Sequence, residues 1–330
     1  MSRIVRFHSL GDAEVLKIED TAPAEPGPGE VRIRVQALGL NRAEALFRQG
    51  KYLETPRLPS RIGYEASGHV DKLGAGVENF KVGDYVATIP SFSQTQYGVY
   101  GDEAIVPARS LTRMPAHVSP AEAAAAWMQY LTAYGALVEL GNLKKGQFVV
   151  VTAASSSVGL AAIQLIKDIG AISIATTRTQ HKVEALLAAG ADHVIVTGEE
   201  NVAARILEIT EKVGADFVFD SVAGPLVSEL AKGCKLEAQI FIYGALSMET
   251  TAFPFRPALK KGLIVRGYTM FLITDDEERF ERSKRYILER LENGVFKPVI
   301  AKVFTLDQIA ESHKYLESNQ QFGKIVVEVK

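Results

Sequence analysis

A serine-rich turn follows the most apolar strand-like run of the sequence, residues 148–152. The turn consists of Ser155, Ser156, Ser157, Val158 and Gly159. A turn from a strand into a helix presents free backbone N–H groups, which together with the helix dipole favour an anion such as a dinucleotide pyrophosphate. The usual fingerprint has several glycines, whereas here small serines, whose hydroxyls can also donate, accompany one glycine. The turn is a candidate dinucleotide site, and a purely structural connection is the alternative.

Basic side chains follow the next strand-like run, residues 172–176. The run is followed by Thr177, Arg178 and Lys182, with no acidic residue at its end. An acidic residue in this place would bind a ribose 2′-hydroxyl, whereas a basic one would bind a 2′-phosphate. Arg178 offers a planar fork to phosphate and Lys182 a point charge. Cations are mildly unfavourable at a helix start, which favours a ligand anion over a solvated surface. NADPH is therefore favoured over NADH.

Strands and helices alternate around these motifs. Strand-like runs lie at 148–152, 172–176, 193–197, 216–220, 239–243 and 263–268. Helical segments lie at 158–169, 180–189 and 200–213, and another is opened by Pro225. Six apolar strands with helical crossovers predict a parallel, doubly wound sheet in an α/β fold. Tyr243 and Gly244 then lie at the end of a strand on the cofactor side.

The first third of the chain is instead β-rich. Residues 31–35 alternate apolar and polar side chains, and glycine and proline turn signals are dense, which predicts a compact barrel or sandwich. Residues 91–101 are polar and aromatic without periodicity and predict a surface loop. Ser119, followed by a proline and by Glu122, predicts a helix start, with helical composition over 121–137.

Composition limits the classes of protein further. The chain has 330 residues, of which 47% are hydrophobic and 23% charged, which fits two globular domains. Lys and Arg total 37 against 39 Asp and Glu, so the net charge of −2 argues against a nucleic-acid binder. Cys234 is the single cysteine, which excludes an intrachain disulfide and a multi-cysteine zinc site. Without an apolar signal core or membrane-span pattern, we expect a cytoplasmic protein with no membrane partner.

Several short motifs, in this order, resemble those of the medium-chain dehydrogenase/reductase superfamily. They are GLNRAE (39–44), GYEASG (63–68), VGDYV (82–86), LTAY (131–134), VGLAAIQ (158–164) and GKIV (323–326). GLNRAE followed by RQGKY (48–52) is most similar to the zinc-independent quinone oxidoreductase branch. The resemblance implies a β-rich GroES-like catalytic domain, residues 1–125 plus 266–330, and an NADP-binding Rossmann domain, residues 126–265. It also implies a homodimer, for which the apolar run 263–268 at a sheet edge would supply the contact.

The same resemblance implies that no catalytic metal is bound. At the positions of the superfamily's zinc ligands this chain has Asn41, Tyr64 and Met128, none of them a normal zinc ligand. The six histidines show no ligand spacing. Tyr64 would then form a pocket wall, and Glu65 would orient neighbouring groups or form a structural ion pair.

The resemblance places Asn41, Tyr52 and Thr132 around the nicotinamide. The Tyr52 phenol can donate a hydrogen bond to an oxygen that gains charge, and packing on nearby prolines is its alternative role. Phe92, Tyr97 and Trp127 are possible pocket aromatics, with ordinary packing as their alternative.

Together these features predict an enzyme, an NADPH-dependent oxidoreductase. Without a metal Lewis acid, the site suits hydride transfer to an electron-poor acceptor, and a quinone is the leading substrate. An alkenal, enone or enoyl-thioester reductase is the nearest alternative. A second alternative, from another class, is a non-catalytic NADPH-binding sensor or structural protein.

Overall fold

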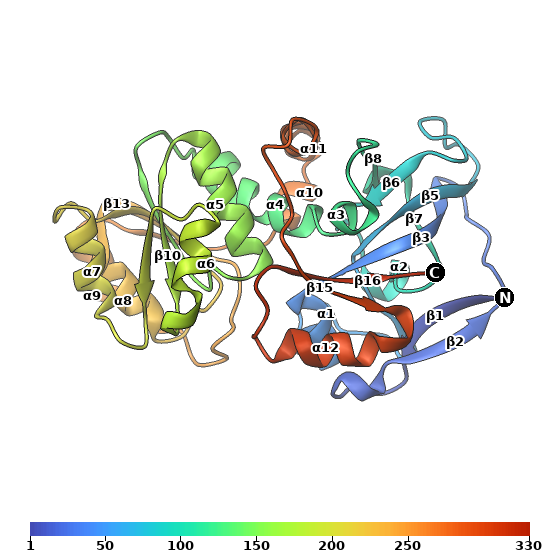
Figure 1. Cartoon of the computed structure of the whole chain (residues 1–330), viewed down its shortest axis with the longest axis horizontal. Helices are drawn as coiled ribbons and strands as arrows, with labels where there is room; N and C mark the ends of the chain where they lie inside the picture. The colour runs from blue at the N-terminus through green and yellow to red at the C-terminus, as the bar shows by residue number, and fades with distance from the viewer. The chain divides into compact units, whose positions relative to one another are not determined.

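The computed structural model describes all 330 residues and divides into two compact units (Figure 1). Unit 1 comprises Met1–Met128 and Leu288–Lys330, and unit 2 comprises Gln129–Ile287. The first boundary lies close to the expected residue 125, whereas the chain returns to unit 1 at Leu288 and not at 266. The segment between these two points packs in unit 2, where the rings of Tyr134 and Tyr286 lie 4.8 Å apart between centroids.

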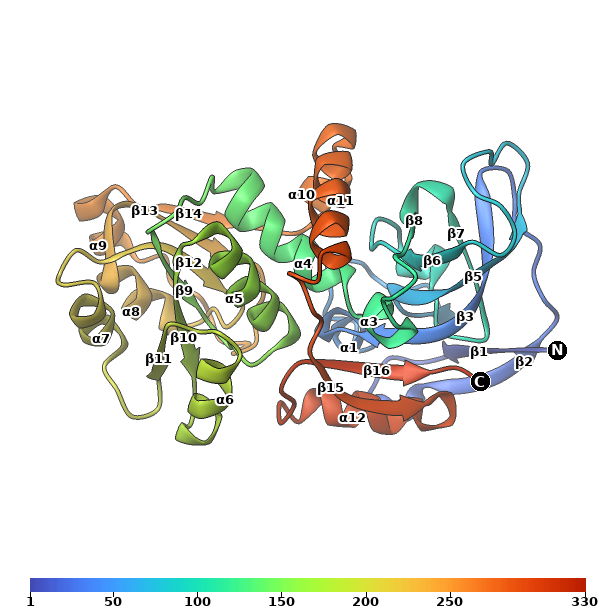
Figure 2. The ribbon, with the colours of Figure 1, turned by 45° about the horizontal axis from the view of Figure 1, so that its top comes forward.

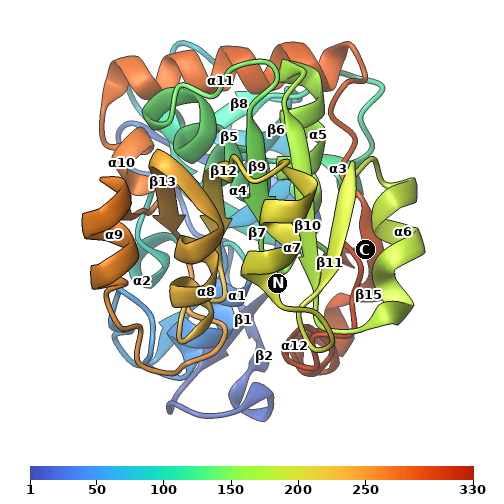
Figure 3. The same cartoon turned by 90° about the vertical axis from the view of Figure 1, so that its left-hand side faces the viewer.

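Unit 2 contains the six-stranded parallel sheet that the sequence predicts. Its strands are β9 (Phe148–Val151), β10 (Ile172–Thr177), β11 (His193–Val196), β12 (Ala215–Asp220), β13 (Cys234–Ile242) and β14 (Ile264–Gly267). Their order is β11-β10-β9-β12-β13-β14, with all neighbours parallel. Figure 3 shows the first five of these strands side by side in this order. This is the doubly wound Rossmann order, in which the chain reverses direction across the sheet between β9 and β12. The expected edge position of residues 263–268 is confirmed, since β14 ends the sheet.

Helices cover both faces of this sheet (Figure 2). They are α5 (Ser157–Ile169), α6 (Val183–Ala188), α7 (Val202–Ile209), α8 (Leu226–Gly233) and α9 (Phe255–Lys261). Three more helices, α4 (Trp127–Tyr134), α10 (Phe271–Thr274) and α11 (Glu277–Glu292), lie wholly or mostly in this unit. Under α7 and α8 the core is apolar and fully buried, with Val150, Ile206 and Val218 at its centre. The strands of this sheet are continuous apolar runs in the sequence because both faces of the sheet are buried.

Unit 1 is built from two β-sheets. Its strands are β1 (Ser2–Phe7), β2 (Lys17–Thr21), β3 (Glu30–Leu40), β4 (Ser60–Arg61), β5 (Glu65–Leu73), β6 (Tyr85–Thr88), β7 (Glu103–Pro107), β8 (Leu111–Arg113), β15 (Ile300–Thr305) and β16 (Lys324–Glu328). One sheet has the order β2-β1-β4, and the other has the order β15-β16-β3-β5-β6-β8 with β7 also paired to β3. β16 inserts between β15 and β3, so the last strand is an internal strand of the larger sheet.

Short helices complete unit 1. They are α1 (Arg42–Arg48), α2 (Gln94–Tyr97), α3 (Pro120–Ala124) and α12 (Ile309–Glu317). Ser119 caps α3 with the expected capping box. No helix of the chain is both long and apolar enough to cross a membrane.

The prediction of one continuous helix over 121–137 is wrong. The helix is interrupted after Ala124, and α4 ends in a π-helical segment, Gly135–Leu140. The N–H of Met128, which would donate to the carbonyl of Ala124 in a continuous helix, donates to Glu65 Oε1 at 2.8 Å. A partner outside the helix thus replaces the helical hydrogen bond.

The expected surface loop over 91–101 is also wrong. The segment contains α2, and Phe92, Gln94 and Tyr100 are buried. Part of the polar groups in this segment are paired: Gln94 Oε1 accepts the Gly63 N–H at 2.9 Å, and the backbone N–H groups of Gln94 and Thr95 donate to Glu54.

Candidate active site

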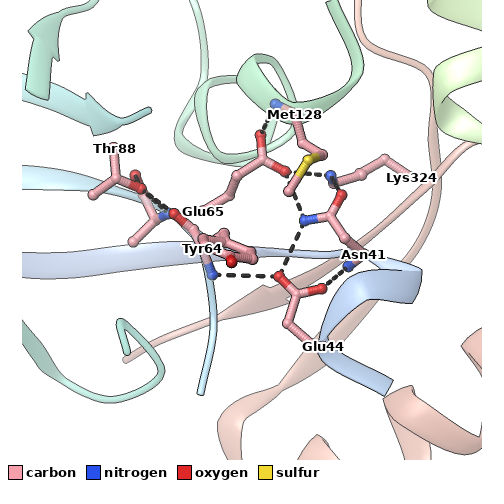
Figure 4. Close-up of polar contacts among 8 residues, drawn as sticks. Asn41, Glu44, Tyr64, Glu65, Thr88, Met128 and Lys324 are labelled. Atoms are coloured by element: carbon pink, nitrogen blue, oxygen red, sulfur yellow. Dashed lines mark hydrogen bonds and ion pairs between the residues drawn. The ribbon is translucent and has the colours of Figure 1, made fainter. Parts of the chain in front are cut away.

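A buried polar cluster in unit 1 gathers around Asn41, the residue that precedes α1 (Figure 4). Its backbone N–H donates to Glu44 Oε2 at 2.7 Å, as in a capping box. The two N–H groups of its side-chain amide donate to Glu44 Oε1 at 3.2 Å and to Glu65 Oε2 at 3.0 Å. Its Oδ1 accepts from the Lys324 ammonium at 2.6 Å. Asn41 is therefore held on every side by charged groups.

Glu65 and Lys324 form a fully buried ion pair in this cluster. Glu65 Oε2 accepts from the Lys324 ammonium, while Glu65 Oε1 accepts the N–H of Met128. Lys324 comes from β16 and Glu65 from β5, so the pair joins strands that are far apart in the sequence (Figure 4). Glu65 was expected either to orient neighbouring groups or to form a structural ion pair, and the structure shows the ion pair.

Glu44 is the second buried carboxyl of the cluster. Burial raises its pKa to about 7, although the Lys324 charge and the N–H groups of Asn41 oppose the rise. Its Oε1 also accepts the backbone N–H of Tyr64 at 3.3 Å. Glu44 therefore ties α1 to the segment before β5 and gains or loses its proton near neutral pH.

Two phenols lie next to this cluster. The rings of Tyr52 and Tyr64 are 6.4 Å apart between centroids in an edge-to-face arrangement, and the two hydroxyls lie near each other. Burial raises the pKa of Tyr52 to about 12 and that of Tyr64 well above its ordinary value. Both hydroxyls thus keep their protons at neutral pH. Tyr64 also contacts the ring of Phe92, at 5.7 Å between centroids, while Trp127 is fully buried.

The donor set of this cluster does not fit a zinc ion. No group of three or more His, Cys, Asp or Glu side chains lies together in a way that could hold a metal. Of the expected ligand positions, Asn41 bonds to the Lys324 ammonium and Tyr64 is an un-ionised phenol. A positively charged side chain already lies where the Asn41 and Glu65 oxygens converge.

In unit 2 the serine-rich turn connects β9 to α5, next to the point where the sheet reverses. Ser156 caps α5, its Oγ accepting the Gly159 N–H at 3.1 Å, which leaves the N–H groups of Ser157 and Val158 without a helical partner. A Cβ at Gly159 would lie 2.5 Å from the carbonyl oxygen of Ala154. Only glycine permits this close approach of the turn and the helix. The free N–H groups of Ser157 and Val158 can therefore hold an anion, although the turn lacks the other glycines of the usual fingerprint.

Cationic side chains adjoin this turn. Lys182 reaches back from the segment after β10, and its ammonium donates to Ser155 Oγ at 3.1 Å. Burial, and then the nearby charge of Arg178, lower the pKa of Lys182. Arg178 is exposed at the end of β10, and Thr177 is buried with its Oγ1 3.4 Å from the carbonyl oxygen of Thr179. The positive charges expected from the sequence therefore converge beside the turn.

Buried polar atoms at the carboxyl ends of β12 and β13 complete this edge of the sheet. The hydroxyls of Ser221 and Tyr243 have no hydrogen-bond partner outside their own contact, and the Tyr243 ring stacks on Phe219 at 4.1 Å between centroids. A Cβ at Gly244 would lie 2.9 Å from the carbonyl oxygen of Ser221. Buried hydroxyls that have no further partner at the carboxyl ends of parallel strands fit a polar ligand.

The other residues divide between the two units. Thr132 is buried on α4 in unit 2, whereas Asn41, Tyr52 and Tyr64 lie together in unit 1. Sequence reasoning missed Lys324 as a member of the cluster. Its signal was a lysine at the start of an otherwise apolar strand, since a charge in a buried strand needs a partner.

Two described families match parts of this chain. Residues 27–116 match the alcohol dehydrogenase GroES-like domain, and residues 157–284 match the family described as zinc-binding dehydrogenase. A quinone oxidoreductase of Pseudomonas aeruginosa is 31% identical over 329 residues, covering 99% of this chain and 99% of that protein. The similarity therefore extends over both units.

Solved structures agree in fold. The crystal structure of Escherichia coli quinone oxidoreductase complexed with NADPH has a TM-score of 0.91 and 28% identity, and covers 99% of each chain. A crystal structure described as an NAD-dependent alcohol dehydrogenase also has a TM-score of 0.91, with 31% identity, and covers 99% of this chain and 100% of that one.

Proposed function

Since this chain belongs to the medium-chain dehydrogenase/reductase superfamily, in its quinone oxidoreductase branch, we propose that it is an NADPH-dependent, zinc-independent reductase of quinones. Bound NADPH would supply a hydride to the acceptor. The protein's own residues would hold the cofactor, place the acceptor and donate a hydrogen bond to the acceptor's oxygen.

The arrangement after β9 and β10 is the single observation that carries this proposal. The N–H groups of Ser157 and Val158 suit a pyrophosphate, and Arg178 and Lys182 suit a 2′-phosphate. No carboxylate lies at the end of β10 to bind a ribose 2′-hydroxyl, because Arg178 occupies that place. These features favour NADPH over NADH, in keeping with the NADPH complex of the E. coli relative.

Zinc independence is supported by the buried cluster. The Lys324 ammonium bonds to Asn41 Oδ1, so a zinc ion there would meet a positive charge. We therefore expect purified protein to contain no stoichiometric zinc and its activity to be indifferent to chelators. Stoichiometric zinc by elemental analysis, together with activity lost on chelation, would contradict this part of the proposal.

Tyr52 is the proposed hydrogen-bond donor to the acceptor. Its raised pKa keeps the phenol protonated at neutral pH, as a donor must be. Reduction of a quinone or an enone by hydride leaves negative charge on oxygen, and a phenol placed there stabilises that charge. Thr132, Tyr243 and Gly244 belong to the proposed cofactor site, and Tyr64 supports Tyr52 through the contact between their hydroxyls.

The test is steady-state oxidation of NADPH with a panel of quinones, enones and enoyl thioesters, repeated with NADH. We expect quinone-dependent oxidation that is faster with NADPH. Activity confined to enones or thioesters would favour the alternative double-bond reductase. NADPH binding without oxidation in the presence of any acceptor would favour a sensor or structural role and overturn the proposal.

The proposal also includes a homodimer. β14 is an edge strand of its sheet, and Ile264 on it is exposed, as are Phe255 and Leu259 of α9. An open strand edge beside apolar side chains favours pairing with a second copy. The cytoplasmic location expected from the sequence stays a prediction, which cell fractionation would test.

A further inference from the structure

The loop that carries Tyr52 has few attachments to the rest of unit 1. It spans residues 52–59 between α1 and β4, and Leu53 is 75% exposed. The hydrogen bonds that tie this loop to the rest of the domain are those accepted by Glu54, and the Tyr52 ring also contacts the Tyr64 ring. The position of the Tyr52 hydroxyl therefore depends on one carboxylate two residues away.

Glu54 accepts three hydrogen bonds from the segment around α2. The donors are the hydroxyl of Ser93, the backbone N–H of Gln94 at 3.1 Å and that of Thr95 at 3.3 Å. Hydrogen bonds to an ionised carboxylate are about twice as strong as neutral ones. The Glu54 side chain therefore fastens the Tyr52 loop to residues 93–95.

The same segment also holds the partner of Tyr52. Gln94 contacts the Tyr64 hydroxyl with its side chain, and its Oε1 accepts the Gly63 N–H at 2.9 Å. Phe92, just before the segment, packs against the Tyr64 ring. The contacts form a closed circuit from Tyr52 to Tyr64, through Gln94 to Glu54, and back along the loop. Glu54 is thus connected to both members of the hydroxyl pair.

We propose that Glu54 is a positioning residue for the reduction step, because it fixes the Tyr52 hydroxyl against that of Tyr64. This inference rests on the proposed function, in which Tyr52 donates to the acceptor. Without Glu54 the loop keeps its covalent ends and the buried Pro56, but the phenol loses its fixed distance to the acceptor. Catalysis that depends on orientation is sensitive to such a loss.

A double-mutant cycle of Glu54→Ala and Tyr52→Phe tests the proposal through the rate of enone or quinone reduction. We expect Glu54→Ala to lower kcat about as much as Tyr52→Phe does, with the KM for NADPH nearly unchanged, and to have less than about a 2-fold effect in the Tyr52→Phe background. Glu54→Gln, whose carboxamide oxygen can still accept, should recover part of the rate. Glu78→Ala, at an exposed glutamate of the same unit, is the matched control.

Three outcomes would overturn the proposal. One is an equal loss from Glu54→Ala in both backgrounds, which would indicate a general structural role. Another is a normal rate in Glu54→Ala, and the third is no effect of Tyr52→Phe. If Glu54→Ala does not fold, Ser93→Ala, which removes one donor only, replaces it in the cycle.

A measurement without turnover separates this inference from the proposed function. Glu54→Ala should increase amide hydrogen exchange at Gln94 and Thr95 by at least about 10-fold, since each N–H loses its acceptor. Glu78→Ala should leave exchange there unchanged. Faster exchange in a protein that reduces no acceptor would mean that the attachment is real and the proposed function wrong. Unchanged exchange would overturn the attachment itself.

Discussion

The side-chain amide of Asn41 has no N–H group left to donate to an acceptor's oxygen. One N–H donates to Glu44 and the other to Glu65, and Lys324 holds the carbonyl oxygen. We therefore assign Asn41 to positioning, since a direct role would break a buried hydrogen bond to a carboxylate. At the scale of single residues this leaves Tyr52 as the donor in the proposed reaction.

Tyr52→Phe should reduce but not abolish turnover. The variant keeps the ring and removes only the hydroxyl, whose hydrogen bond we value at about 1–2 kcal/mol as charge develops, or roughly 5- to 30-fold in kcat. The loss should be largest with enones, because a quinone spreads the new charge over its ring. Complete loss with both acceptors at unchanged NADPH affinity would instead indicate obligate proton transfer from Tyr52.

Arg178→Ala should weaken NADPH binding much more than NADH binding. A charge-assisted hydrogen bond to phosphate contributes about 1.5–3 kcal/mol, which is roughly 10- to 100-fold in Kd. Fluorescence titration with both cofactors measures the change. If the ratio of the two affinities equals that of the parent, Arg178 does not bind the 2′-phosphate, and Lys182 becomes the residue to substitute.

Glu44 should make the stability of the protein depend on pH. Its pKa rises from 4.5 to about 7 on folding, so between these values the folded chain holds a proton that the unfolded chain has lost. The free energy of unfolding should therefore fall as pH rises through this window, by up to about 3 kcal/mol at 1.36 kcal/mol per pKa unit, and then level off.

Denaturant titrations from pH 4.5 to 8 measure this slope. Glu44→Gln should be less stable at low pH, because its amide would face the donors on Asn41 and Tyr64, but its stability should vary less across the window. Glu78→Gln should keep the parent slope. Identical slopes in parent and Glu44→Gln would show that another group titrates.

At the scale of elements, the first turn of α5 has two roles. Ser156 caps the helix, and the N–H groups of Ser157 and Val158 are free for a ligand. Ser156→Leu should therefore cost about 1 kcal/mol of stability through the lost cap and also block the approach of a pyrophosphate. Thermal unfolding and NADPH titration measure the two effects separately. A folded variant with the parent's NADPH affinity would mean that the phosphates bind elsewhere.

The sequence predicted elements best where local pattern decides them. All six strands of the parallel sheet follow from apolar runs, and the start of α3 follows from the capping pattern at Ser119. The break after Ala124 could not be predicted this way, because its cause, Glu65, is distant in sequence. The burial of the segment around Gln94 could not be predicted for the same reason, since Gln94 Oε1 and the backbone N–H groups of Gln94 and Thr95 find their partners on Gly63 and Glu54.

The candidate site also divides into features that local sequence determines and features that depend on contacts distant in the sequence. The anion-binding turn and its basic neighbours are local in sequence and were predicted from residue types. The cluster around Asn41 depends on Lys324, which is 283 positions away in the chain. Neither periodicity nor spacing reports a contact of that range, so only the fold could identify this partner.

At the scale of the whole molecule, the edge of the parallel sheet determines the expected assembly. Ile264→Lys places a charge on the exposed edge strand β14 and should weaken the homodimer at least about 10-fold, since an unpaired charge in an apolar interface is costly. Sedimentation velocity over a concentration series measures the change. Val213→Lys, at an exposed valine of the same unit, is the control. A parent protein that sediments as a monomer would contradict the dimer outright.

The internal position of β16 has a consequence for synthesis on the ribosome. Every residue of unit 2 is translated before Lys324, so unit 2 can complete its sheet while unit 1 still lacks an internal strand. Until β16 emerges, the edge of β3 stays open at Ala37–Leu40 and the Glu65 carboxylate has no ammonium partner. The nascent chain is thus most exposed to misassembly late in translation, and ribosomes stalled before residue 324 should carry a folded unit 2 beside an open, chaperone-accessible unit 1.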